Sequence, residues 1–361
     1  MKCSRFTIAL SSIIIILISY IAYNIIYILL TNAPLENIPK FSCQKVNYTF
    51  PMEDFVKVDD NTLIAGGANT EDMLNFNPNK IVEKGTLVLF DIRTKQFKNL
   101  ELKNFPKNLN FFPHGMELYK DKYIYVINHG LNSIDGERFE IFEIIKEKIE
   151  VKYLNYIMSI KLPEEFHTAT NGLAVAEEDD IFFTKFFPVH PPAIDKANFF
   201  NKIYFYSSTI VNFIFNLKLS YLYHYKNGII TKVKDSQSTF NNGVAYDQFN
   251  RFIFLVQTID NNIRVFKYEE NGNIKFIRDI YLGYKIDNVI FDEKTRILNV
   301  GILGFGTYSG YAGLAEIYPD KNFEIKFPFY DKINSTASSG IQIDGKIYLV
   351  SPMEKHLLYC E

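Results

Sequence analysis

The stretch "FNNGVAYDQ" at residues 240–248 decides the fold, and a related stretch, "TATNGLAVAEED", lies upstream at residues 168–179. Each places an Asn and a Gly before a short run of alternating apolar residues, which is the pattern of a half-buried strand. Four more segments begin with a polar residue and continue in the same alternation. The six segments start at Glu53, His114, Asn171, Asn242, Asp287 and Ser339, and they recur every 45–71 residues.

A second apolar run follows each segment at a nearly constant distance. In the first five, an aliphatic or aromatic residue lies ten positions after the polar one, and in the sixth Ile347 lies eight positions after it. The five residues are Leu63, Ile124, Ile181, Phe252 and Ile297. A strand pair that recurs about every fifty residues is typical of propeller blades. We therefore predict an all-β fold, a six-bladed β-propeller, with a sandwich of chance spacing as the alternative.

This fold gives the six polar residues a common place. The first strand of each propeller blade lines the axis, so these residues are expected to form a ring at one mouth of the central tunnel. Glu53 and Asp287 would repel each other in such a ring, and their desolvation would add to the cost. Ca²⁺ accepts carboxylate and amide oxygens in irregular geometry and would relieve both problems. The alternative is that these residues only form turns that lead into strands, and the spacing alone favours neither.

The N-terminus predicts a membrane segment. No residue from Phe6 to Leu35 is charged, and roughly 20 apolar residues suffice to cross a bilayer as a helix. Lys2 and Arg5 precede this stretch and favour a cytosolic N-terminus. The predicted organisation is a cytosolic tail (1–5), a signal-anchor transmembrane helix (6–32), a linker (33–42) and the propeller domain (43–361). If the segment is instead a cleaved signal, the protein is secreted.

In either case the body would face a lumen or the cell exterior. Asn47 and Asn334 begin Asn-x-Ser/Thr triplets, which are acceptors for N-glycosylation. Cys43 and Cys360 are the two cysteines that follow the apolar segment, and an oxidising compartment favours a disulfide between them over two free thiols. A net charge of −2 gives no electrostatic reason to expect nucleic acid as a partner.

Several stretches, in order, carry a family resemblance: "MEDFVKV", "FFPHGMELY", "YVINHG", "FNNGVAYD", "KIDNVIFDEKTRILNVG" and the terminal "LLYCE". From about Phe41 to Glu361 the chain resembles the serum paraoxonase/arylesterase family of six-bladed, calcium-dependent propeller hydrolases. The resemblance implies a retained apolar N-terminus and a Cys43–Cys360 disulfide. It also implies one catalytic calcium ion and a His pair, His114 and His129, above it. The implied calcium ligands are Glu53, Asn171, Asn242, Asp287 and Asn288.

The chain also departs from that family. Family members hold a second, buried calcium partly through an Asp, and that position is Gly172 in this sequence. Asp54 and the Met116 carbonyl remain from the second site, so a second calcium is in question. Lys185, Phe186 and Phe187 replace an Asn-Asp-His run, and Leu303 stands where a pocket His is frequent. The preferred substrate therefore cannot be carried over.

The function implied by the resemblance is hydrolysis of carboxylic esters or lactones. Calcium would polarise the carbonyl, while His114 takes a proton from water and His129 orients or relays. One alternative is a non-catalytic, membrane-tethered binding module with a structural calcium, and another is a propeller lactonase that uses a different divalent metal. The segment 199–223, uncharged from Ile203 to Leu217, is expected to contact membrane lipid near the tunnel mouth or to form a buried blade strand.

Overall fold

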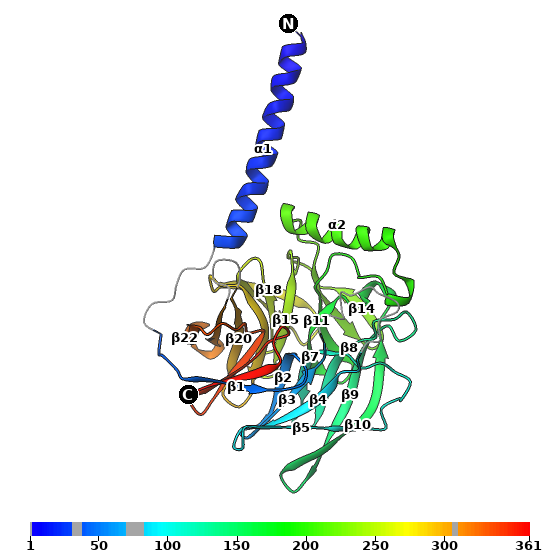
Figure 1. Cartoon of the computed structure of the whole chain (residues 1–361), viewed down its shortest axis with the longest axis vertical. Helices are drawn as coiled ribbons and strands as arrows, with labels where there is room; N and C mark the ends of the chain where they lie inside the picture. Colours follow the sequence, from blue (N-terminus) through cyan, green and yellow to red (C-terminus); the bar gives the residue numbers. More distant parts are fainter. Residues whose placement is uncertain (1, 31–37, 70–82, 305–309) are drawn as a thin grey trace.

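The computed structural model describes residues 2–30, 38–69, 83–304 and 310–361. In this part of the chain, the strands form six sheets around a common axis, and two α-helices lie outside them (Figure 1). The predicted all-β, six-bladed propeller is therefore confirmed.

The first three blades follow each other along the chain, and each runs outward from an innermost strand. Blade 1 contains β2 (Met52–Asp59), β3 (Thr62–Gly67), β4 (Thr86–Asp91) and β5 (Gln96–Asn99). Blade 2 contains β7 (Pro113–Tyr119), β8 (Tyr123–His129), β9 (Glu137–Glu147), β10 (Glu150–Lys161) and, at its outer edge, β6 (Glu101–Lys103). Blade 3 contains β11 (Thr170–Glu177), β12 (Asp180–Lys185), β13 (Tyr221–Lys226) and β14 (Ile229–Lys232).

The last three blades complete the circle. Blade 4 contains β15 (Asn241–Asp247), β16 (Phe252–Gln257), β17 (Asn262–Tyr268) and β18 (Ile274–Tyr281). Blade 5 contains β19 (Ile286–Asp292), β20 (Ile297–Leu303), β21 (Tyr311–Tyr318) and β22 (Glu324–Lys332). Blade 6 contains β23 (Ser339–Ile343), β24 (Lys346–Val350), β25 (His356–Cys360) and β1 (Cys43–Asn47).

The two ends of the propeller domain close the circle in blade 6. β1 pairs antiparallel with β25, and this pairing sets Cys43 opposite Cys360. The two cysteines form a disulfide across 317 residues of sequence. The predicted disulfide is therefore confirmed, and the first and last strands of the domain cannot separate without breaking it.

The hydrophobic core lies between neighbouring blades rather than at the axis. One cluster joins Val56 and Ile64 of blade 1 to Ile124 and Phe142 of blade 2. Comparable clusters lie between the other neighbours, for instance between blades 4 and 5. The innermost strands therefore pack on the strands of the neighbouring blades, and their apolar residues alternate with smaller or polar ones.

The helices lie at one end of the propeller. α1 (Lys2–Leu30) projects from the body, and α2 (Phe199–Phe215) lies across the end from which β11 and β15 start (Figure 1). Tyr20 and Asn24 of α1 donate hydrogen bonds to the carbonyls of Phe215 and Ile214. In the described residues, no helix is both long and apolar enough to cross a membrane, so the transmembrane assignment of 6–32 is not confirmed. Half of the predicted linker (33–42), residues 33–37, lies outside the described residues.

One local alternative needs correction. Residues 199–223 are not a buried blade strand, because they form α2 and then lead into β13. The stretch after Leu303 connects β20 to β21 within blade 5; residues 305–309 lie outside the described residues.

Candidate active site and metal centre at the hub

The six polar residues that define the repeat all lie at or next to the start of an innermost strand. These strands are β2, β7, β11, β15, β19 and β23, and each contacts the next around the axis. The structure therefore brings together Glu53, His114, Asn171, Asn242, Asp287 and Ser339 at one mouth of the tunnel.

Five of the six innermost strands carry the same irregularity at this point. In each, two residues of the inner strand lie opposite one residue of its neighbour, which is the signature of a β-bulge. The paired positions on either side of the bulge are Met52 and Phe55, Pro113 and Met116, Thr170 and Leu173, Asn241 and Val244, and Ile286 and Val289. The bulged pairs are thus Glu53-Asp54, His114-Gly115, Asn171-Gly172, Asn242-Gly243 and Asp287-Asn288. Every predicted calcium ligand and His114 is a bulge residue, and a bulge can re-aim a side chain that regular pleating would turn aside.

Glycine at the second bulge position allows neighbouring blades to approach closely. A Cβ at Gly115 would lie 2.2 Å from the carbonyl oxygen of Asn171. A Cβ at Gly172 would lie 2.8 Å from Cα of Gly243, and one at Gly243 would lie 2.7 Å from Cα of Asn288. The bulges of blades 2 to 5 therefore nest against one another, and this contact sets how closely the side chains before them converge.

The converging side chains leave several buried oxygens without a hydrogen-bond partner among the described residues. Glu53 Oε1 accepts from Asn288 Nδ2 at 3.2 Å, and Asp287 directly precedes Asn288 in sequence. Ser339 Oγ is one of the unpartnered atoms, and the other four belong to predicted calcium ligands: Glu53 Oε2, Asn171 Oδ1, Asn242 Oδ1 and Asp287 Oδ1. Since buried polar atoms in proteins nearly always find partners, four unpartnered oxygens in one place suggest a missing cation.

The pKa values of the buried carboxyl groups at the hub also suggest a missing cation. Burial, and then the charges of Asp287 and Asp54, raise the pKa of Glu53 well above its usual range. Burial and then Asp54 raise the pKa of Asp287 to about 8. Burial also raises the pKa of Asp54 to about 7. Without a counter-charge these carboxyl groups resist ionisation at neutral pH, whereas a divalent cation would stabilise their charged forms.

The donor set suits a hard cation. No group of three or more His, Cys, Asp or Glu side chains in the described part of the chain is arranged as a metal site. The hub differs from such a group because three of its five predicted ligands are asparagines. Two carboxylates with amide oxygens suit Ca²⁺, which prefers oxygen ligands and needs no imidazole or thiolate.

Two observations concern the predicted second calcium. Gly172 has no room for an acidic side chain, because even a Cβ would contact the backbone of Gly243 and Val244. Asp54 and Met116 do lie together, and the Asp54 carboxylate accepts the backbone N–H groups of Met116 (3.0 Å) and Phe55 (2.9 Å). The second calcium stays a prediction, with fewer side-chain ligands than the first.

The predicted His pair lies beside the oxygen ring. The ring centroids of His114 and His129 are 4.8 Å apart, and both side chains are buried. His114 Nε2 lies 3.1 Å from Asn171 Nδ2 and 3.7 Å from Glu53 Oε1. Burial and the neighbouring His129 lower the pKa of His114 well below its usual value. His114 is therefore neutral at physiological pH, and in that state it can accept a proton.

Glu137 is a site residue that the sequence did not reveal. Its Oε1 lies 2.8 Å from Nδ1 of His129, and its Oε2 accepts the backbone N–H of Thr168 at 2.8 Å. Thr170 Oγ1 also donates to this carboxylate. The only trace in the sequence is the short connection 130–136, which sets His129 directly opposite Glu137 in the β8–β9 hairpin.

The residues that depart from the family pattern lie on the same end of the propeller. Phe186 stacks on Phe240 with ring centroids 4.8 Å apart, and Phe187 meets Phe205 of α2 at 5.1 Å. Asn212 of α2 donates to the carbonyl of Thr239, shortly before the hub residue Asn242. These contacts place α2 and an aromatic wall beside the mouth of the hub. Leu303 ends β20 and is half-buried.

The predicted glycosylation acceptors, Asn47 and Asn334, are both exposed on the surface.

The protein is thus a six-bladed propeller with a polar site at its hub. Bulged inner strands gather buried oxygens and a His pair there. The model of the arylesterase family matches residues 52–303 of the 361-residue chain. The chain therefore belongs to the arylesterase family.

Curated relatives agree with this family at low identity. Human serum paraoxonase/lactonase 3 is 23% identical over 248 residues, which cover 66% of this chain and 62% of the relative. The serum paraoxonase/arylesterase 2 of Gallus gallus is 22% identical over 321 residues, which cover 82% of each protein. The chain thus matches less than two thirds of the length of the human relative.

Solved structures support the fold alone. The luciferin-regenerating enzyme superposes with a TM-score of 0.51 at 10% identity, over 89% of this chain and 95% of that one. The Malassezia sympodialis allergen Mala s 1 also gives 0.51, at 11% identity over 90% and 96% of the two chains.

Proposed function

We propose that this chain is a calcium-dependent hydrolase of carboxylic esters or lactones, with its reaction centre at the hub. The observation that carries the proposal is the group of four unpartnered, buried oxygens on Glu53, Asn171, Asn242 and Asp287. Family membership and the names of the paraoxonase relatives support the reaction class. The residues that would hold the ion are Glu53, Asn171, Asn242, Asp287 and Asn288. When bound, a calcium ion would act as a Lewis acid toward the substrate carbonyl.

The chain's own side chains would manage the proton. His114 is kept neutral by burial and is the general base for a water molecule at the hub. His129, in ring contact with His114, would share or relay the proton. The Glu137 carboxylate would stabilise the resulting positive charge and fix the orientation of the His129 ring. Glu137 is thus a positioning residue, because it acts through His129.

The proposal is tested by assaying the purified protein with an aryl acetate and a δ-lactone before and after chelation. We expect turnover of at least one substrate, its loss on chelation, and its recovery with Ca²⁺ but not with Mg²⁺. Calcium binding without turnover of any ester or lactone would instead support the binding-module alternative. Recovery by a different divalent metal alone would contradict calcium dependence.

We also propose that the body lies at a membrane surface, in a lumenal or extracellular compartment. Large apolar side chains of α2 are exposed, with Phe199 at 69% and Phe200 at 80%, and α1 is hydrogen-bonded to this helix. The disulfide and the exposed acceptors Asn47 and Asn334 suit such a compartment. N-terminal sequencing of the mature protein would show whether residues 6–32 are retained as an anchor or are cleaved. A freely soluble monomer after removal of residues 1–35, with no affinity for lipid vesicles, would contradict the membrane proposal.

A further inference from the structure

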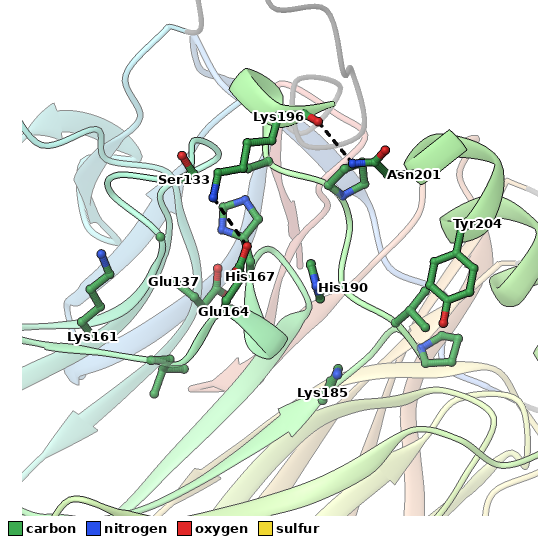
Figure 2. A pocket seen from close by; sticks show the side chains of 16 residues that line it. Ser133, Glu137, Lys161, Glu164, His167, Lys185, His190, Lys196, Asn201 and Tyr204 are labelled. Carbon is green, nitrogen blue, oxygen red and sulfur yellow. Dashed lines mark hydrogen bonds and ion pairs between the residues drawn. The ribbon is translucent and has the colours of Figure 1, made fainter. Parts of the chain in front are cut away.

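A pocket lies on the same end of the propeller as the hub site, between blades 2 and 3 and α2. Its volume is about 600 Å³, which is within the range of small-molecule sites, about 300–1,000 Å³. The pocket is lined by the loop before β9, the segment between β10 and β11, the segment after β12, and the first turns of α2. In the view of Figure 2, Lys185 and His190 lie between the group of Glu137, Glu164 and His167 and, on the other side, Tyr204.

Lys185 supplies an uncompensated positive charge inside this pocket. The residue is half-buried, its ammonium group lies 5.7 Å from the ring centroid of Phe166, and it forms no ion pair among the described residues. Burial lowers the pKa of Lys185, and Glu165 and Lys232 have smaller, opposite effects. An ammonium group in this position would gain from an anion in the pocket, because an anion would stabilise its charged form.

The two carboxylates of the pocket are already in use. Glu137 accepts from Thr168 and Thr170 and is held against His129. Glu164 lies 3.7 Å from Lys196 at the exposed rim. Neither carboxylate forms an ion pair with Lys185 in the described part of the structure, and Glu137 keeps its negative charge on the side of His167.

His167 adds a second polar group without a partner. Only 4% of the residue is exposed, and its Nε2 has no hydrogen-bond partner in the described part of the structure. His167 is part of the pocket lining. Burial lowers the pKa of His167, and the ring already bonds to the backbone of Leu131. Its free Nε2 is therefore an acceptor, which a donor group and not a carboxylate would satisfy.

The rest of the lining is apolar and sets the shape of a ligand. Leu162, Pro188, Val189 and Ala193 contribute aliphatic surface, and the largely exposed ring of Tyr204 stands at one side. A small inorganic anion would leave this apolar part of the cavity unfilled. A monoanion with an apolar tail would match both the half-buried Lys185 and the aliphatic walls.

We propose that this pocket binds an amphipathic monocarboxylate, whose carboxylate lies against Lys185 and whose tail contacts Val189 and its aliphatic neighbours. The proposal goes beyond the hydrolase function and does not depend on it. Glu137 separates this pocket from His129, so the ligand would lie one side chain away from the His pair.

The test measures binding of octanoate to the purified full chain by isothermal titration calorimetry. Lys185→Gln is expected to weaken binding at least about tenfold, since it removes a charge-assisted contact. Lys185→Arg keeps the charge and should retain affinity within a few fold. The matched control is Lys275→Gln on exposed β18, which should bind octanoate like the unmodified chain.

Further arms make the result decisive. Octanamide, which is neutral, should bind at least tenfold more weakly than octanoate, and inorganic phosphate should not displace octanoate. Should Lys185→Gln fail to fold by circular dichroism, Val189→Asp offers a second variant that repels the same ligand. The proposal is overturned if octanoate does not bind at millimolar concentration, if octanamide binds equally well, or if phosphate competes on equal terms. Unchanged affinity in both folded variants would also overturn it, because octanoate would then bind elsewhere.

Discussion

Blades 1 to 5 and blade 6 share one architecture but differ at the axis. The inner strands of the first five blades carry a bulge at the hub, whereas β23 and β24 of blade 6 pair without any shift from Ser339 to Lys346. All predicted calcium ligands lie in bulged strands. Blade 6 instead contains both ends of the domain and the disulfide. Under the proposed function, five blades would supply the reactive groups, and the sixth closes the ring.

Blade 6 nevertheless connects Glu53 and Asn288, the first and the last of the predicted calcium ligands in the sequence. Ser338 Oγ donates to the carbonyl of Glu53 at 2.6 Å, and the Ser338 carbonyl accepts the backbone N–H of Asn288 at 2.8 Å. Glu53 and Asn288 lie 235 residues apart in sequence. The contact between Glu53 and Asn288 therefore depends on blade 6, which contributes no predicted calcium ligand.

The largest effect is expected from a bulged position of blade 5. Asp287→Asn keeps the size of the side chain but removes a negative charge from the proposed ion site, so kcat/KM should fall by about 10³-fold or more. Steady-state assays check this result. The control, Asp344→Asn in the exposed turn of blade 6, should keep full activity. Full turnover by Asp287→Asn would remove the distinction between the blades.

The next largest effect is expected from the disulfide of blade 6, whose loss should lower the stability of the folded domain. Cys360→Ser opens a closed loop of 317 residues, and the chain-entropy model gives a loss of about 4–5 kcal/mol in the free energy of unfolding. Urea denaturation under non-reducing conditions measures this loss, and activity per folded molecule should stay unchanged. A loss below about 1 kcal/mol would mean that strand pairing alone closes the ring.

A smaller effect is expected behind the His pair of blade 2. Glu137→Gln removes the charge that holds His129, so kcat should fall by about 10²-fold, while KM and the melting temperature stay close to their original values. The control, Glu143→Gln, changes a carboxylate on the same strand that pairs with Lys122 at the surface. Equal kcat values for the two variants would exclude Glu137 as a positioning residue.

The smallest effect is expected from two neighbouring serines of blade 6. Ser338→Ala loses a buried hydrogen bond to Glu53 and should lower the free energy of unfolding by about 1 kcal/mol. Ser339→Ala alters the one repeat position without a bulge and should change kcat/KM less than about twofold, well under 1 kcal/mol. Chemical denaturation and kinetics of the pair check both values. A large activity loss in Ser339→Ala would make blade 6 part of the reaction centre.

The sequence predicted the fold because propeller blades repeat locally. The alternation of apolar residues identified the inner strands, and all six polar start positions lie where the repeat placed them. Even the bulges left a trace. The apolar residue came ten positions after the start in five blades but eight in the sixth, where the bulge is absent and Asp344-Gly345 forms a two-residue turn.

The remaining features depend on contacts that no local pattern encodes. Glu137 reaches His129 through hairpin register, and Gly172 excludes an acidic side chain only because Gly243 of the next blade lies against it. The pocket around Lys185 needs three connecting segments and α2 to be in place. At these positions, the amino-acid sequence alone showed at most that a residue differs from the family pattern.

Calcium stoichiometry tests the central claim, that the bulged strands gather oxygens from distant parts of the chain around one divalent ion. Elemental analysis and calorimetric titration of the purified chain should give one calcium ion per molecule, bound by Asp344→Asn and lost in Asp287→Asn. Failure to take up any divalent ion at millimolar concentration, or equal calcium binding by Asp287→Asn, would contradict it.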